Sequence, residues 1–415
     1  MPICRYALCL PILVFACPAF ATEPTIWPQW RGPSRDGQVT APAWPDTLKP
    51  EILKPLWRVA ELGPSYSGPV VSAELVFVTE TANKENEVVI ALDRKTGKEV
   101  WRTKWAGSMS VPFFAAKNGS WIRSTPALNG DTLYVGGMRD LLVALDANSG
   151  QQRWRLDFVK EFDTPLPAFG FASSPLVGTD GVYVQAGGGV VKVDAKTGKV
   201  RWRALSDGGG MNGSAFASPV LARFQGKDQV VVQARTKMAG LEPSTGGVLW
   251  EREIPAFRGM NILTPVPVGD GILTSTYGGT TQLFQIKAGP LGFTTADGWM
   301  FKYEGNMSTP VVVADHAYLL GRDRRLLCIN VKTGKLAWAT DERFGEYWSL
   351  VANGDKILAL DNRGLLYLLK ANPVEFELLD KRKIADSETW AHLAVCGDEL
   401  FIRDSTGISA FRWFR

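Results

Sequence analysis

Short apolar runs, rich in β-branched and aromatic residues, recur along almost the whole chain. Thr132-Leu133-Tyr134-Val135 is one such run, residues 141–145 form the next, and Asp146 and Gly150 bracket a tight turn after it. Runs of this length bounded by turn residues predict β-strands joined into hairpins. The runs are too short and too β-branched for helical repeats, so the pattern predicts an all-β protein.

The turn and the strand after it repeat at a fixed spacing. Five copies place an acidic residue or Asn, then Thr or Ser, then Gly, and then Trp four residues after the Gly. The repeated glycines are Gly97, Gly150, Gly198, Gly246 and Gly334, and the repeated tryptophans are Trp101, Trp154, Trp202, Trp250 and Trp338. We expect the Gly to adopt a left-handed conformation and the Trp to be buried against a neighbouring unit.

A second marker precedes each unit: a proline with Ser or Thr one or two residues before it. These prolines are Pro69, Pro126, Pro175, Pro219, Pro265 and Pro310, separated by 57, 49, 44, 46 and 45 residues. A period near 45 residues, filled with short strands, is typical of four-stranded propeller blades. Two further units are degenerate: residues 349–384 lack the Trp, and residues 264–303 carry a longer insert before Trp299.

The length decides the number of blades. Residues 57–415 accommodate eight units of about 45 residues. The last segment supplies only three strands, and residues 53–59, with Trp57, resemble the missing outer strand. The sequence therefore predicts a closed eight-bladed β-propeller over residues 53–415, whose N-terminal strand completes the last blade and removes the exposed sheet edge.

The first residues predict export. Arg5, an apolar run over residues 6–15 and Ala19-Phe20-Ala21 form a secretory signal peptide at residues 1–21. The alternative is lipoprotein processing at Cys17, which would tether the chain to a membrane. We expect residues 22–52 to form an N-terminal arm, and the protein to be periplasmic or secreted, or anchored at the outer membrane.

Charge and metal-binding residues exclude several function classes. The net charge is only +4 and no long Lys/Arg run is present, which argues against nucleic-acid binding. Outside the signal region only Cys328 and Cys396 remain, as two buried thiols or, alternatively, one disulfide. With two histidines, His316 and His392, and no clustered acidic residues, we expect no metal site.

The repeat resembles the tryptophan-docking motif of the pyrroloquinoline-quinone (PQQ) propeller superfamily, with Ala91, Gly97 and Trp101 at its first, seventh and eleventh places. The superfamily contains PQQ-dependent dehydrogenases and also non-catalytic members, such as the propeller lipoprotein of the outer-membrane β-barrel assembly machine. The segment Trp27-Pro28-Gln29-Trp30-Arg31-Gly32-Pro33 resembles the start of many exported PQQ-like repeat proteins.

The dehydrogenases suggest a test on residues. They carry adjacent cysteines over the cofactor and hold Ca²⁺ with carboxylate and amide oxygens, and this ion needs six to eight oxygens. This chain has no Cys-Cys pair, and residues 121–124, 170–173, 214–217, 260–263 and 305–308, which enter the inner strands, contain no carboxylate. The sequence favours a non-catalytic protein without cofactor, and a PQQ enzyme is the alternative.

The loops that join each outer strand to the next inner strand are long and aromatic, which is unusual for loops. We expect this loop face to bind a protein or peptide partner in the cell envelope, with outer-membrane protein assembly as one setting, and the chain to be a monomer. The expected partner-binding residues are Tyr66, Trp121, Arg123, Phe171, Phe216, Asn261, Met307, Trp348, Trp390 and His392. Glycan binding is a third hypothesis, because aromatic platforms also stack on sugars.

Overall fold

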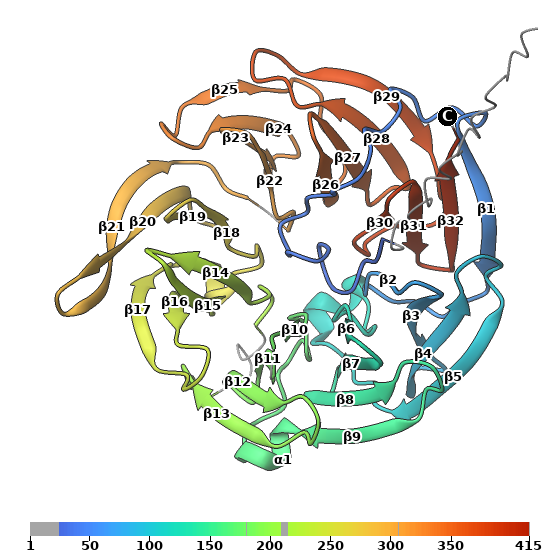
Figure 1. The fold of residues 1–415 in the computed structure, drawn as a ribbon, viewed down its shortest axis with the longest axis horizontal. Helices are drawn as coiled ribbons and strands as arrows, with labels where there is room; N and C mark the ends of the chain where they lie inside the picture. Colours follow the sequence, from blue (N-terminus) through green and yellow to red (C-terminus); the bar gives the residue numbers. More distant parts are fainter. Residues whose placement is uncertain (1–24, 180, 209–214, 306, 415) are drawn as a thin grey trace, which may run out of the picture.

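Eight four-stranded antiparallel sheets form a closed ring in the computed structural model (Figure 1). The structure describes residues 25–179, 181–208, 215–305 and 307–414. The predicted signal peptide, with Cys17, lies outside the described residues. The ring confirms the predicted propeller and its number of blades.

Each of the first seven blades uses four consecutive strands. Blades 1 to 4 consist of β2 (Val70–Val71), β3 (Leu75–Ala82), β4 (Asn86–Asp93) and β5 (Glu99–Ala106); β6 (Ala127–Asn129), β7 (Thr132–Gly137), β8 (Leu141–Asp146) and β9 (Gln152–Asp157); β10 (Leu176–Val177), β11 (Gly181–Ala186), β12 (Gly189–Asp194) and β13 (Val200–Ala204); β14 (Val220–Phe224), β15 (Lys227–Gln233), β16 (Lys237–Leu241) and β17 (Val248–Glu253).

Blades 5 to 8 consist of β18 (Val266–Val268), β19 (Gly271–Ser275), β20 (Thr281–Gly289) and β21 (Gly292–Phe301); β22 (Val311–Val313), β23 (His316–Leu320), β24 (Leu326–Asn330) and β25 (Leu336–Ala339); β26 (Trp348–Asn353), β27 (Lys356–Asp361), β28 (Leu365–Lys370) and β29 (Glu377–Lys383); β30 (Ala394–Cys396), β31 (Glu399–Asp404), β32 (Gly407–Trp413) and β1 (Leu53–Ala60).

Helical segments occur only in loops between blades within the described residues. The 3₁₀ helix η1 (Phe113–Asn118) follows β5, the one-turn helix α1 (Phe158–Phe162) follows β9, and η2 (Phe257–Gly259) follows β17. No helix in this part of the chain is long and apolar enough to cross a membrane.

The ring closes where the first and last parts of the chain meet. Strand β1 pairs antiparallel with β32, from Leu53 opposite Trp413 to Ala60 opposite Gly407. This pairing gives blade 8 its fourth strand and confirms the prediction that the N-terminal strand completes the last blade. It also supplies β32 with main-chain hydrogen-bond partners that a free sheet edge would lack.

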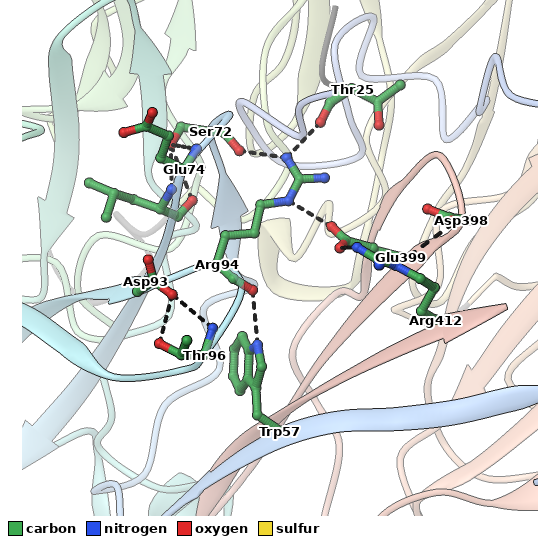
Figure 2. A network of polar contacts seen from close by, with 11 residues as sticks. Thr25, Trp57, Ser72, Glu74, Asp93, Arg94, Thr96, Asp398, Glu399 and Arg412 are labelled. Atoms are coloured by element: carbon green, nitrogen blue, oxygen red, sulfur yellow. Dashed lines mark hydrogen bonds and ion pairs between the residues drawn. The ribbon is translucent and has the colours of Figure 1, made fainter. Parts of the chain in front are cut away.

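A buried ion pair crosses the same seam (Figure 2). Arg94, in the turn after β4, donates from Nε to Glu399 at 2.7 Å, and from Nη1 to the carbonyl oxygens of Thr25 and Ser72 at 2.9 and 2.7 Å. The side chains of Arg94 and Glu399 are 9% and 6% exposed. Trp57 of β1 donates to the carbonyl oxygen of Arg94 at 2.9 Å. One arginine therefore joins blade 1, blade 8 and the N-terminal arm.

The repeated tryptophans dock on the turn of the next blade. Trp101 Nε1 donates to the carbonyl oxygen of Ala147 at 2.9 Å, and Trp154 Nε1 donates to that of Ala195 at 3.1 Å. The turn glycine lies beneath the ring: Gly97 has a φ of +71°, and a Cβ added there would lie 2.7 Å from the ring of Trp57. Both the positive φ and the close approach require glycine.

Blade 5 departs from this pattern. Its β20–β21 hairpin is long and extends out of the ring (Figure 1), so Trp250 finds no short turn to dock on and donates instead to Gln229 of its own blade at 2.6 Å. Trp299 of β21 restores the pattern for the next blade, since it donates to the carbonyl oxygen of Val331 at 2.6 Å and packs on Gly334. The long insert therefore changes one docking contact and preserves the other.

The proline marker has a structural role that its spacing alone does not reveal. The hydroxyl of the residue before the proline accepts a hydrogen bond from the main-chain N–H of the blade before it. This relay runs from Gly68 N to Thr125, Thr125 N to Ser174, Ser174 N to Ser218, Ser218 N to Thr264 and Thr264 N to Thr309, at 2.9 to 3.1 Å. Beyond Thr309 the direction reverses, with Trp348 N donating to Ser308 and Leu393 N to Ser349. These bonds join neighbouring blades near the axis.

Candidate functional site

The N-terminal arm occupies the axis of the ring. In Figure 1 the chain before β1 crosses the centre between the inner strands. Trp27 pairs with Val71 of blade 1, the carbonyl oxygen of Pro28 accepts from Leu128 N of blade 2, and Gln38 bridges to Ala352 of blade 7. We call residues 27–39 the axial segment.

Two buried arginines anchor the axial segment. Arg31 donates to the carbonyl oxygens of Thr309 and Pro310 at 2.9 and 2.8 Å, and Arg35 donates to that of Ser174 at 3.0 Å. Burial lowers the pKa of Arg31 to about 10 and that of Arg35 to about 9. Both remain charged at neutral pH, so the axis carries two positive charges that are held mainly by backbone carbonyls.

The loop face is the end of the ring where the outer strand of each blade connects to the inner strand of the next, as residues 107–126 connect β5 to β6. Aromatic side chains surround the axis there. Trp390 lies 6.0 Å from Tyr66 and stacks on Tyr347 at 6.0 Å, measured between ring centroids. The guanidinium of Arg123 lies over the ring of Tyr66, 5.7 Å from its centroid. Four of the expected partner-binding residues therefore come together, because Arg123 Nε also donates to the carbonyl oxygen of Trp121 at 3.3 Å.

A groove of about 410 Å³ adjoins this cluster, between the β3–β4 turn and the loop after β5. It is lined by Thr81, Lys84, Ser108, Met109, Ser110, Ala116, Gly119, Ser120 and Trp121. Two loop hydrogen bonds hold its walls: Ile122 N donates to the Thr81 hydroxyl at 2.9 Å, and Val111 N donates to that of Ser120 at 3.1 Å. The groove is therefore built into the loop structure.

Exposed phenylalanines extend the apolar surface from this groove toward the next blades. Phe113 and Phe114 of η1 are 91% and 54% exposed. Phe114 contacts Phe169, and Phe169 contacts Phe216, with centroids 6.4 and 5.6 Å apart. An exposed apolar strip is a common feature of protein-binding sites. We call Phe113, Phe114, Phe169 and Phe216 the phenylalanine strip.

The structure places four expected partner-binding residues in the interior. Trp348 is 1% exposed, because it lies in β26 and its indole donates to Asp361 at 3.2 Å. Phe171 is buried against Phe158 and Gly136. The expectation that these two rings lie on the loop face is wrong: they belong to the packing between blades.

Asn261 and His392 are also buried. Asn261 Nδ2 donates to the carbonyl oxygens of Ala234, Arg235 and Ile254 at 3.1, 3.0 and 3.0 Å, so its amide fixes the loop of blade 4 and is not available to a partner. His392 packs edge-on against Trp30 at 5.7 Å. Burial, and then the charge of Arg31, lowers the pKa of His392 to about 3, so the imidazole is neutral at physiological pH. Met307 and Phe216 remain half-buried on the loop face.

A calcium–quinone centre of the kind found in PQQ dehydrogenases does not fit these residues. The axial segment, with Trp30, Arg31 and Arg35, occupies the axis, and the two buried arginines place positive charge there. Among the described residues, no group of three or more His, Cys, Asp or Glu side chains is arranged to hold a metal ion. Cys328 and Cys396 are free and buried, so their alternative as a disulfide is wrong.

Sequence reasoning missed Arg31 and Arg35 as the residues that fill the axis. The only signal was the unusual run of residues 27–33, which combines two tryptophans, an arginine and two prolines. Lys84 and Met109 in the groove gave no signal, because single residues of these types are common on any surface.

Comparisons with known proteins support the repeat-based assignment. A family model described as outer membrane protein assembly factor BamB matches residues 53–118 and 85–340. The outer membrane protein assembly factor BamB of Yersinia pestis is 20% identical over 332 residues, which are 77% of this chain and 78% of that protein.

Two solved structures share the fold. BamB from Moraxella catarrhalis superposes with a TM-score of 0.62 at 16% identity, over 88% of this chain and 98% of that one. The quinohemoprotein alcohol dehydrogenase from Comamonas testosteroni gives 0.63 at 14% identity, over 95% and 81%. Similar scores for an assembly factor and an enzyme show that the fold does not decide the function. The family model, which spans most of the ring, does decide the family: the chain belongs to the one described as outer membrane protein assembly factor BamB.

Proposed function

We propose that this protein is a non-catalytic scaffold of the periplasm that binds a protein partner on its loop face and acts in outer-membrane protein assembly. The phenylalanine strip carries this proposal, because exposed aromatic rings beside a preformed groove lose unfavourable contact with water when a partner covers them. The name of the Yersinia pestis relative supports the assembly setting.

The arrangement at the axis supports recognition over catalysis. The chain's own axial segment occupies the place where a ring-shaped fold would otherwise hold a small molecule. The remaining recognition surface is the loop face, with Tyr66, Arg123 and Trp390 around the axis and the groove beside Trp121. Recognition surfaces of this type combine aromatic rings with a few arginines.

Co-purification from cell envelopes tests the proposal. The double variant Phe113→Ser, Phe114→Ser removes exposed rings, so it should keep the fold while losing the partner. Val374→Ser is the matched control, since Val374 is 80% exposed but lies in the β28–β29 turn at the opposite end of the blades.

We expect the double variant to recover less than about a tenth of the outer-membrane assembly proteins that the unmodified chain recovers, as loss of a hot spot worth about 1.4 kcal/mol or more implies. The control should recover the full amount. Equal recovery by the double variant, at an unchanged melting temperature, would disprove the loop-face proposal.

A further inference from the structure

We propose that the groove beside Trp121 and the guanidinium of Arg123 together bind an extended acidic peptide segment of the partner protein, with an apolar side chain in the groove and a carboxylate on Arg123. This inference rests on the proposed function and names the chemistry of the partner. Three observations carry it: the uncompensated charge of Arg123, its fixed orientation, and the shape and charge of the groove.

Arg123 is a cation without an anionic partner among the described residues. Burial lowers the pKa of its guanidinium to about 10. Within the part of the chain that the structure describes, no ion pair joins Arg123 to a carboxylate, and Tyr66 is the one group whose charge would favour the cation. The carboxylate of Glu388 is engaged by the Trp390 indole, which donates to it at 2.9 Å. A desolvated charge gains most from an opposite charge that a ligand brings.

The orientation of Arg123 is set before any ligand arrives. Nε donates to the carbonyl oxygen of Trp121 at 3.3 Å and Nη2 donates to that of Gly119 at 3.1 Å, while the guanidinium lies over the ring of Tyr66. Nη1 has no hydrogen bond to any described residue and can donate outward. A planar, fixed guanidinium is well suited to a carboxylate.

The groove supplies the apolar half of the site. Its volume of about 410 Å³ lies within the range of about 300–1,000 Å³ of sites that enclose small ligands. Met109 and the Trp121 ring give it apolar surface, and the hydroxyls of Ser108, Ser110 and Ser120 can accept or donate to a peptide backbone. Residues 119–121 line the groove and precede Arg123 in the same loop, so two side chains two positions apart on one extended strand, which point to the same face, can reach both.

Charge decides which segment fits. Lys84 is the one charged residue among those that line the groove, and Arg123 lies on its other side. Two cations, and no carboxylate among the described residues that line the groove, favour an acidic segment and disfavour a basic one. Peptides that carry an aromatic residue two positions from an Asp or Glu match both halves of the site.

The test uses the purified protein and a fluorescein-labelled octapeptide in which one Phe has an Asp two positions before it and another Asp two positions after it. Matched peptides replace both Asp with Asn, or the Phe with Ala. We expect Arg123→Gln and each peptide replacement to weaken binding about tenfold, since a charge-assisted hydrogen bond and a buried aromatic anchor each contribute that much. The Asn peptide should bind Arg123→Gln as tightly as it binds the unmodified chain, because the change in the peptide and the change in the protein remove the same interaction.

Arg258→Gln is the matched control, because Arg258 is another loop-face arginine over an aromatic ring, 5.2 Å from the centroid of Phe257, and lies three blades away. It should leave the affinity unchanged, and Arg123→Lys should restore part of it. Each of four results would overturn the inference. The Asp and Asn peptides bind with equal affinity, or Arg258→Gln lowers the affinity as much as Arg123→Gln does. No peptide binds, or an oligosaccharide alone displaces the peptide. Partner recovery that depends on Phe113 and Phe114 but not on Arg123 would overturn it while leaving the proposed function intact.

Discussion

At the scale of single residues, burial separates tryptophans that look alike in the sequence. Trp202 docks on the turn of the next blade, with its Nε1 on the carbonyl oxygen of Pro243 at 3.2 Å, and Trp348 lies in the core between Phe344 and Tyr367. Trp121 instead lies half-buried beside the groove on the loop face. The first two are packed inside the ring, and the third borders the groove that we propose as a partner site.

Truncating these three side chains to Ala should destabilise the protein in the order of their burial. Trp348→Ala and Trp202→Ala should each lower the free energy of unfolding by about 3–5 kcal/mol, as loss of a buried aromatic does. Trp121→Ala should cost less than half as much. Denaturant midpoints of the three variants measure this, and a larger loss for Trp121 than for Trp348 would reverse the assignment of core and surface.

Buried Glu87 gives a pH-dependent contribution to stability. Its carboxylate accepts from Met138 N at 2.6 Å and from Trp105 Nε1 at 2.8 Å, which joins blade 1 to blade 2, and burial raises its pKa from 4.5 to about 7. Between those values the folded state holds a proton that the unfolded state has lost, so this group stabilises the fold below about pH 4.5 and loses that contribution as the pH rises to 7.

Glu87→Gln should remove this pH dependence. The unfolding free energy of the unmodified chain, relative to the variant, should fall by about 3 kcal/mol between pH 4.5 and pH 7. Comparing the two proteins cancels the effects of Asp140 and His392, which also titrate with shifted pKa values. Urea titrations at several pH values measure the difference, and a difference that stays constant with pH would contradict the assignment.

At the scale of elements, the seam between β1 and β32 holds the ring closed. The sequence predicted this pairing because three C-terminal strands leave a place for a fourth, and the edge of a sheet requires a partner. It did not predict the Arg94–Glu399 pair, which joins residues more than 300 positions apart. A pairing between distant charges has no local pattern, whereas a repeated strand does.

Removal of the Arg94 side chain should lower the stability of the protein at this seam. Arg94→Ala leaves Glu399 with Arg412 alone and removes the hydrogen bonds to Thr25 and Ser72, so we expect a loss of about 3–5 kcal/mol. Arg223→Ala is the control, because its pair with Asp228 is 66% exposed on both sides and should contribute at most about 1 kcal/mol. Similar melting temperatures for Arg94→Ala and the control would show that the seam does not depend on this ion pair.

The difference between repeated and unrepeated parts of the chain also explains which parts of the site could be predicted. Tyr66, Trp121, Arg123 and Trp390 lie on loops whose position follows from the repeat, so their convergence near the axis could be predicted. Trp348 and Phe171 lie where the sequence alone does not distinguish an exposed loop position from a buried one, and only the packing of neighbouring blades places them in the interior. Arg31 and Arg35 could not be placed, because an arm without a repeat has no register against the ring.

At the scale of the whole molecule, the axis of the ring is filled, whereas one end of the ring presents an exposed apolar surface. The axial segment fills the centre with buried arginines and Trp30, and the loop face presents the phenylalanine strip and the groove. In the function that we propose, a partner contacts the loop face, and the eight blades provide a rigid support for the loops that make the contact.

Photo-crosslinking in living cells tests this account most directly. A benzoylphenylalanine placed at position 113 lies on the loop face, and one placed at position 374 lies on the opposite end of the ring with similar exposure. The account predicts crosslinks from position 113 to a protein of the outer-membrane assembly machinery and none from position 374. Crosslinks from position 374 alone would contradict it.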